Sequence, residues 1–84
     1  MNLCIKMNPI VKAVKPINNF MLHIWFSNGE EKLFDVKPYL NLGIFSELNN
    51  LELFNTVRPD GLSIEWANEA SLSPDTVYIG SVNI

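Results

Sequence analysis

The chain has 84 residues, of which 48% are hydrophobic, 11% aromatic and 18% charged, and its formal net charge is −3. This hydrophobic content excludes an intrinsically disordered chain, which needs low hydrophobicity and high net charge. The six basic residues are scattered along the sequence, so the clustered phosphate contacts of sequence-independent nucleic-acid binding are not expected. The length suits one domain, which we place at residues 1–84 with a core at about 9–79.

Two features of the composition bear on partners. A domain this small cannot bury all of its apolar residues, and the excess favours an interface with another protein. The acidic balance fits a basic protein partner, although a net charge of −3 is also what solubility alone would require.

The N-terminal part of the sequence indicates a compartment. The single cysteine, Cys4, leaves no intramolecular disulfide and no thiolate metal cluster, which suits a reducing environment. Residues 1–15 lack the long apolar stretch and cleavage site of a signal peptide. The most apolar run, residues 20–26, is interrupted by His23 and is far shorter than the ~20 residues of a membrane helix. We therefore expect a cytoplasmic protein that does not enter the membrane.

The first third of the chain predicts an N-terminal strand followed by a hairpin. Residues 10–15 alternate weakly between two prolines, which suits a short strand near a sheet edge. After a turn at Asn18-Asn19, residues 20–27 are rich in aromatic and β-branched residues, and residues 30–36 form the returning strand. The pair Asn28-Gly29 between them tolerates the positive φ angles of a type I′ turn, so we predict a two-residue turn.

A two-residue turn would fix which side chains share a face of this hairpin. It would pair Ser27 with Glu30, and every pair behind it would follow. One face would hold Phe20, Leu22, Ile24, Phe26 and Leu33, and the other would hold Met21, His23, Trp25, Phe34 and Val36. Both sets are largely apolar, as in a central hairpin that is covered on both sides, or covered on one side and open to a partner on the other. A longer turn would exchange the pairs, because a one-residue slip moves every side chain to the opposite face.

The remaining sequence predicts short helices and then a second hairpin. In residues 39–55 apolar side chains recur at about every fourth position, but Gly43 and Asn49-Asn50 interrupt them, so one or two short helices are expected. Residues 56–66 contain Pro59-Asp60-Gly61 between two apolar runs, which is typical of a hairpin turn.

Residues 74–80 give conflicting signals. Ser73 and Pro74 resemble the cap and first position of a helix, whereas the run from Thr76 to Ile79 prefers strand, and both readings stay open. The elements together define an α+β fold. We predict a small antiparallel sheet of two hairpins plus an N-terminal edge strand, with one or two short helices between the hairpins.

No residue pattern indicates a catalytic, cofactor or metal site. His23 is the only histidine. The one carboxylate considered as its partner is Asp35, which would lie near it only through cross-strand placement, so a half-buried strand residue is the simpler interpretation. Cys4 has no matching base. The nine carboxylates form neither a calcium loop nor a Glu-x-x-His pattern, and the four glycines form no phosphate-binding loop. We therefore expect a protein that is not an enzyme and has no cofactor.

The aromatic residues supply a candidate partner surface instead. Most of them must fill the core, but tryptophan is enriched at binding hot spots, so Trp25 and Trp66 are also candidates for interface anchors. The proposed surface consists of Met21, His23, Trp25, Phe34 and Trp66.

Several runs of the chain occur in an order that is similar to a known family. These runs are Val11-Lys12-Ala13-Val14-Lys15-Pro16, the alternating stretch Leu22, Ile24, Phe26 with Asn28-Gly29-Glu30, Phe34-Asp35-Val36, Gly43-Ile44-Phe45 with Leu48, Leu53-Phe54, Ile64-Glu65-Trp66 with Asn68, and Leu72-Ser73-Pro74-Asp75 with Val77-Tyr78. Over roughly residues 9–79 they resemble the bacterial domain of unknown function 2442 family. The resemblance implies a small α+β domain and no catalytic residues that can be carried over.

The same resemblance implies two kinds of partner. Some members carry a helix-turn-helix domain after this module, and others are short proteins encoded beside a second small protein, as in a toxin–antitoxin pair. Because this chain stops at Ile84, a direct transcription-factor role is not expected.

Three functions follow as hypotheses. The first is a non-enzymatic protein-interaction module, with an antitoxin-like role beside the product of a neighbouring gene. The second is a DNA-associated regulator that acts through a partner or as a dimer, and the third is a small ligand-binding domain or enzyme with a concave pocket. Short outer strands would also allow a homodimer through edge pairing. Direct nucleic-acid and membrane binding are not expected.

Overall fold

The computed structural model describes residues 9–84, so Cys4 lies outside the described residues. Within that range the strands are β1 (Val11–Ile17), β2 (Met21–Phe26), β3 (Glu31–Asp35), β4 (Arg58–Asp60), β5 (Ser63–Glu65), β6 (Ser71–Leu72) and β7 (Val82–Asn83). The helical segments are the 3-10 helices η1 (Lys37–Tyr39) and η2 (Gly43–Asn49) and the α-helices α1 (Leu51–Phe54) and α2 (Pro74–Gly80).

The strands form two antiparallel sheets. The larger sheet has the order β1-β2-β3-β7, and the smaller has the order β4-β5-β6. This confirms the α+β class, with two hairpins, an N-terminal edge strand and short helices between the hairpins. The two hairpins belong to separate sheets, which meet where the backbone N–H of Val11 donates to the carbonyl oxygen of Leu62 at 3.1 Å.

The turn of the first hairpin has three residues, so the predicted register was wrong by one. Gly29 has a φ of +90°, whereas Asn28 keeps a negative φ, which a type I′ turn does not allow. The N–H of Gly29 donates to the carbonyl of Phe26 at 3.0 Å, and the N–H of Phe26 donates to the carbonyl of Glu30 at 2.9 Å. This is a turn closed by glycine in the left-handed region, the usual form of a three-residue hairpin loop.

The longer turn exchanges part of the two predicted faces. Leu22 now pairs with Phe34, and His23 pairs with Leu33. Phe34 and Val36 therefore join Leu22, Ile24 and Phe26 on the buried face. Leu33 moves to the opposite face, beside His23, because a shift of one residue reverses the direction of each side chain.

The open question at residues 74–80 is resolved in favour of a helix. The hydroxyl of Ser73 accepts a hydrogen bond from the N–H of Thr76 at 3.2 Å, and Pro74 begins α2. Val77 on this helix is fully buried, so tertiary packing outweighs the strand preference of the local sequence. In the second hairpin, Pro59 lies within β4, and the turn itself is Gly61-Leu62.

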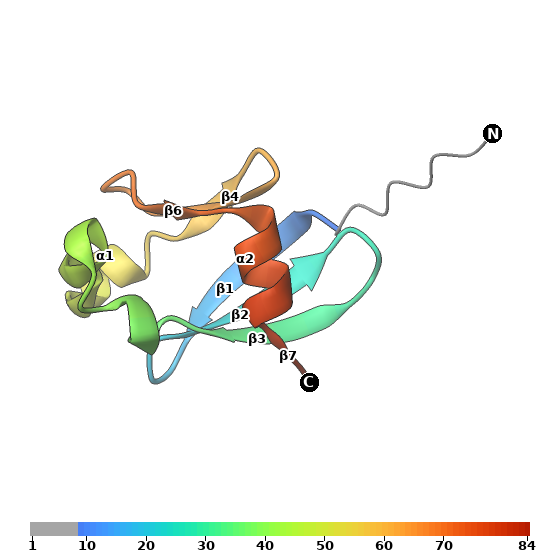
Figure 1. Cartoon of the computed structure of the whole chain (residues 1–84), viewed down its shortest axis with the longest axis horizontal. Coiled ribbons are helices and arrows are strands. Elements are labelled where there is room, and N and C mark those ends of the chain that lie inside the picture. The colour runs from blue at the N-terminus through green and yellow to red at the C-terminus, as the bar shows by residue number, and fades with distance from the viewer. Residues whose placement is uncertain (1–8) are drawn as a thin grey trace.

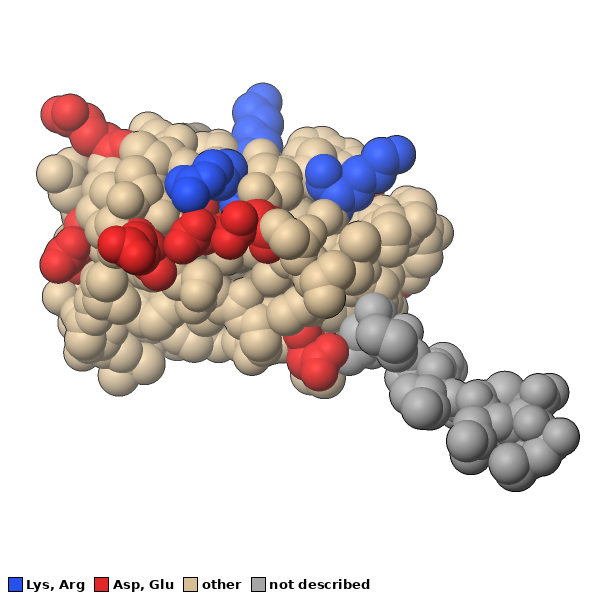
Figure 2. Space-filling model, turned by 90° about the horizontal axis from the view of Figure 1, so that it is seen from above, with Lys and Arg blue, Asp and Glu red and all other residues tan. Residues whose placement is uncertain are grey.

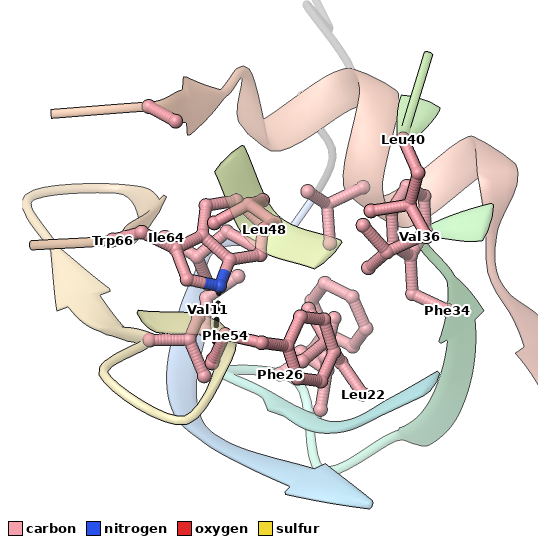
Figure 3. Packing of buried hydrophobic residues seen from close by; sticks show 14 residues of the cluster. Val11, Leu22, Phe26, Phe34, Val36, Leu40, Leu48, Phe54, Ile64 and Trp66 are labelled. Atoms are coloured by element: carbon pink, nitrogen blue, oxygen red, sulfur yellow. Dashed lines mark hydrogen bonds between the residues drawn. The ribbon is translucent and has the colours of Figure 1, made fainter. Parts of the chain in front are cut away.

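One hydrophobic cluster joins both sheets and the helices (Figure 3). Its members are Val11, Leu22, Ile24, Phe26, Phe34, Val36, Leu40, Leu48, Phe54, Val57, Ile64, Trp66, Ala70 and Val77. Trp66 is fully buried at its centre, and its indole N–H donates to the carbonyl of Phe54 at 3.1 Å. The one polar group of this large side chain is thereby satisfied inside the core.

The two faces of the larger sheet are covered to different extents. The second sheet and α2 lie on the same side of the larger sheet, with α1 at one end (Figure 1). The face of β1, β2 and β3 that turns away from them, called the outer face below, has no helix or strand of the described chain packed on it. Half of each central strand therefore faces away from the core.

Candidate interaction surface

The outer face is built by alternate residues of three neighbouring strands. From β2 it receives Met21, His23 and Trp25, which are half-buried, while the residues between them are fully buried on the core side. The cross-strand pairs extend it. Ala13 on β1 and Glu31 on β3 flank Trp25, Lys15 and Leu33 flank His23, and Ile17 and Asp35 flank Met21. Val82 on β7 pairs with Leu33 and continues the surface at 60% exposure.

Two rings stack at the middle of this face. The imidazole of His23 and the indole of Trp25 lie nearly parallel, with an interplanar angle of 8° and centroids 4.0 Å apart. His23 Nε2 lies 3.0 Å from Glu31 Oε1, so the carboxylate holds the edge of the imidazole while Trp25 supports its plane. The stack presents a rigid aromatic surface, because both side chains have few remaining rotamers.

A shallow hollow adjoins the stack. It is lined by Lys12, Ala13 and Trp25, at the point where the register of β1 shifts between Val11 and Ala13. This irregularity is a β-bulge-like feature, and it places Lys12 beside the indole. A cation and an aromatic ring thus border the same small depression.

At the other end of the outer face, the ammonium group of Lys37 contacts three neighbouring groups. Lys37 Nζ lies 3.0 Å from Asp35 Oδ1, 3.0 Å from the carbonyl oxygen of Asn19 and 3.7 Å from Met21 Sδ. The charge of Asp35 is therefore matched inside the chain. The other carboxylate of this face is Glu31, whose side chain is 50% exposed. Within residues 9–84 it forms no ion pair with a lysine or an arginine.

The five residues proposed from the sequence divide into two groups. Met21, His23 and Trp25 lie together on the outer face, as expected from their alternation. Phe34 and Trp66 do not belong there, because they are 1% and 0% exposed and sit in the core. Phe34 is buried because the three-residue turn shifts the register by one residue. Trp66 is buried because its indole packs against the rings of Phe45 and Phe54.

Sequence reasoning missed other members of the surface. Leu33 was assigned to the opposite face, and Val82 was not placed in any strand. Glu31 and Lys15 were recognised only as scattered charges. The signal that would have found Leu33 is weak, since Asn28-Gly29 suits a three-residue loop that begins at Ser27 as well as a two-residue turn.

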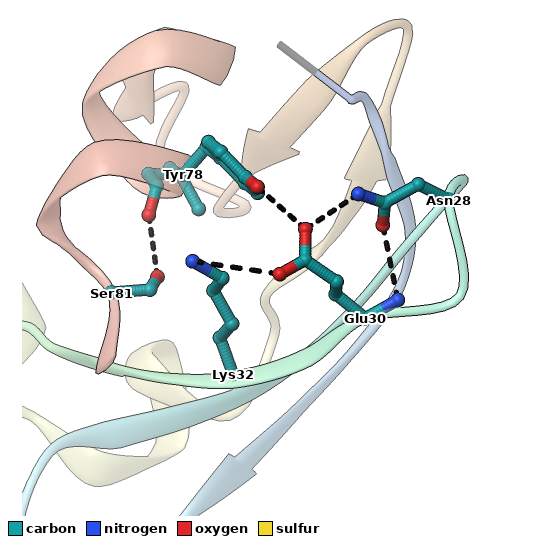
Figure 4. Close-up of polar contacts among 6 residues, drawn as sticks. Asn28, Glu30, Lys32, Tyr78 and Ser81 are labelled. Carbon is teal, nitrogen blue, oxygen red and sulfur yellow. Dashed lines mark hydrogen bonds and ion pairs between the residues drawn. The ribbon is translucent and has the colours of Figure 1, made fainter. Parts of the chain in front are cut away.

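A second polar cluster joins the first hairpin turn to α2 (Figure 4). Glu30 Oε1 accepts from the Tyr78 hydroxyl at 2.5 Å and from Asn28 Nδ2 at 2.5 Å. Lys32 Nζ lies 4.0 Å from Glu30 Oε2 and 4.2 Å from the centroid of the Tyr78 ring. Tyr78 also packs edge-on against Phe26, with centroids 5.0 Å apart. This cluster links the helix to the sheet.

The electrostatics of this cluster follow from those contacts. The hydrogen bond from Tyr78, with a smaller contribution from Asn28, lowers the pKa of Glu30, because both donors favour the ionised carboxylate. The same hydrogen bond raises the pKa of Tyr78, since the hydroxyl donates its proton to a negative acceptor. The cluster is therefore formed when Glu30 is ionised and Tyr78 is neutral.

The charge distribution on the side of the second sheet is mixed. In Figure 2, basic side chains stand apart from one another and acidic ones gather beside them. Arg58 and Glu65 form an ion pair there at 2.9 Å. Among the described residues on that side, Figure 2 shows no continuous basic patch of the kind that follows a nucleic-acid backbone.

Neither a metal site nor a membrane-spanning helix is found within residues 9–84. No three His, Cys, Asp or Glu side chains in this range lie close enough together to hold a metal ion. Nor does this range contain a helix with the length and apolar character needed to span a membrane.

The architecture is that of a small α+β domain whose main sheet is covered on one face and bears an aromatic strip on the other. The chain belongs to the family described as protein of unknown function (DUF2442), whose model matches residues 11–83. This confirms the resemblance seen in the sequence. No curated protein and no solved structure gave a significant match to the chain.

Proposed function

We propose that this protein is a non-enzymatic protein-interaction module that binds its partner through the outer face. The observation that carries the proposal is the strip of Met21, His23, Trp25 and Leu33, which lies at the centre of the main sheet with no layer of residues 9–84 over it.

The core side of the main sheet is filled by buried residues, Leu22, Ile24 and Phe26 of β2 and Phe34 of β3. The sheet is therefore already anchored and does not need the outer face for its stability. Antiparallel sheets with one solvated face normally carry polar residues there, whereas this one carries a tryptophan, a methionine and a leucine. An aromatic and aliphatic strip rimmed by charges, here Lys15 and Glu31, is the arrangement found at binding hot spots.

The experiment pairs a surface variant with a matched control. The full chain would be co-expressed with the product of its neighbouring gene, purified through a tag on one partner, and titrated by isothermal calorimetry. Trp25→Ala removes the largest side chain of the outer face, and we expect it to weaken the complex by at least about tenfold. Leu42→Ser removes an apolar side chain that is 54% exposed on a different part of the surface and should leave the affinity unchanged.

Each result has a definite meaning. Failure to form a complex at micromolar concentration would contradict the neighbouring product as partner. A complex that Trp25→Ala leaves intact would contradict the outer face as the binding surface. Circular dichroism of both variants checks that they remain folded.

The antitoxin-like role is a narrower form of this proposal. It is supported by the family resemblance and by the partner-binding character of the outer face. It predicts that expression of the neighbouring product alone slows growth and that co-expression of this chain restores it. Restoration that is unaffected by Trp25→Ala would separate the antitoxin role from this surface.

A further inference from the structure

The charges on the outer face differ between its β1 side and its β3 side. The β1 side carries Lys12 and Lys15, both exposed, and the β3 side carries Glu31. The aromatic strip on β2 lies between them. Asp35 adds little to the negative side, because Lys37 neutralises it within the chain at 3.0 Å. The face is thus positive along β1 and apolar along β2, and on β3 it carries one carboxylate without a lysine or arginine partner within residues 9–84, Glu31, which contacts His23 at 3.0 Å.

Such a surface can be complementary to itself. When two copies stack face to face about a two-fold axis that runs along β2, β1 of each copy lies over β3 of the other. This rotation does not shift residues along the strand direction, so each residue faces residues of the second copy at the same position along the strands. Lys12 lies at the level of Trp25, as does Glu31, so each copy's Lys12 approaches the Glu31 of the second copy. A two-fold axis across the strands would instead place β1 over β1 and oppose like charges.

We propose that the occupant of the outer face is a second copy of this chain, related by a two-fold axis along β2. This inference rests on the proposed function, since it takes the outer face to be a protein-binding surface and names its occupant. Two sheets that stack in this way lie about 10 Å apart, a distance that lysine and glutamate side chains span from opposite sides. The aliphatic stem of Lys15 would cover the Leu33 of the second copy.

The size of the face limits the strength of the dimer. Strands about 4.8 Å apart, with a rise of about 3.3 Å per residue, give this four-stranded sheet a face of roughly 400 Å². Two such faces bury less than the ~1,200 Å² below which complexes are weak or transient. The dimer should therefore dissociate on dilution, and a heterologous partner could displace the second copy.

Charge reversal tests both the surface and the axis. One variant carries Lys12→Glu with Lys15→Glu and is negative on both sides, and the other carries Glu31→Lys and is positive on both sides. Sedimentation velocity of the full chain would be followed over about two decades of concentration, up to about 1 mM. We expect a reversible dimer for the natural sequence and at least about tenfold weaker association for each variant alone, because like charges now face each other.

An equimolar mixture of the two variants should recover a one-to-one dimer, since both charge pairs are restored. The control, Glu52→Lys, reverses an exposed charge on α1 away from the outer face and should dimerise like the natural sequence.

Two outcomes would overturn the proposal. The first is a natural chain that stays monomeric throughout the concentration range. The second is a dimer that neither variant weakens. It would indicate either a contact elsewhere, for example at the edge of β7, or β1 stacked over β1, which keeps like charges opposite each other in both variants.

The result is distinguishable from failure of the proposed function. If the natural chain is monomeric but its complex with a heterologous partner is lost in Trp25→Ala, the outer face remains a binding surface and only its occupant is different. If Trp25→Ala affects neither self-association nor any complex, both proposals fail together.

Discussion

At the scale of single residues, surroundings decide what a side chain does in this protein. Trp25 and Trp66 are chemically identical, yet one is stacked on a histidine at the surface and the other is fully buried with its N–H bonded to a backbone carbonyl. Glu30 is likewise distinguished from the other carboxylates by its partners, since a tyrosine and an asparagine both donate to it. Its contacts bridge positions 30 and 78, so its ionisation is tied to the packing of α2 on the sheet.

Glu30→Gln should change how stability depends on pH. The pKa of Glu30 is lowered in the folded protein, mainly by the Tyr78 hydrogen bond, so its contribution is present above the unfolded pKa of about 4.3 and is lost as pH falls through the folded value. Glutamine can still accept from Tyr78 but does not titrate. We expect the natural sequence to have the higher melting temperature at pH 7 and the difference to shrink as the pH approaches 3, measured by circular dichroism. A difference that is constant over this range would show that the charge of Glu30 does not stabilise the fold, and Glu52→Gln serves as the exposed control.

At the scale of elements, the closeness of α2 to β3 depends on a glycine. A Cβ atom at Gly80 would lie 2.9 Å from Cε1 of Phe34, and that ring is 1% exposed and packed in the core. Gly80, the last residue of α2, therefore lies so close to the sheet that a side chain at this position would collide with Phe34. Together with the cap at Ser73, this explains why residues 74–80 form a short helix with sharp boundaries.

Gly80→Ala should destabilise the protein, although glycine to alanine in a helix normally stabilises it by about 0.5–1 kcal/mol. The added methyl group must displace either the Phe34 ring or the end of α2, which typically costs about 1–3 kcal/mol. Urea denaturation would measure the change in the free energy of unfolding. Ile79→Ala, at a neighbouring position that is 75% exposed, should change it by less than about 0.5 kcal/mol. A Gly80→Ala protein more stable than the natural sequence would contradict the close contact.

At the scale of the whole molecule, neither sheet can bury its apolar face alone. The smaller sheet has strands of two or three residues, and its Ile64 and the neighbouring Trp66 are buried against residues of the larger sheet and α1. Small sheets without a packing layer are marginal in water. The shared cluster therefore implies that the two sheets fold and unfold as one unit.

The variant Trp25→Phe tests whether the two sheets unfold as one unit, because it leaves Trp66 as the single tryptophan and as a fluorescence reporter of the smaller sheet. Its fluorescence and the far-ultraviolet circular dichroism of the whole chain should give the same urea midpoint and a single transition, as two-state unfolding requires. Separate midpoints would show that the second sheet opens independently. The substitution itself should cost little stability, since the indole of residue 25 is half-buried on the outer face.

Local signals in the sequence were sufficient where the backbone itself sets the structure. The aromatic and β-branched residues of 20–27 predicted a strand, and the pair Asn28-Gly29 located a hairpin turn. The family resemblance rested on the same features and is confirmed over residues 11–83. These features depend on φ preferences and capping, which act within a few residues.

The sequence by itself thus determined the α+β class, the position of the first hairpin and the presence of an apolar strip at Met21, His23 and Trp25. Only the tertiary structure decided that Phe34 faces the core and Leu33 the outside, that residues 74–80 are helical, and that Trp66 is enclosed. The physical reason is that a period of two does not say which set of side chains faces inward. That choice depends on one residue of turn length and on the layer that packs against the strands, and this layer comes from parts of the chain far apart in sequence.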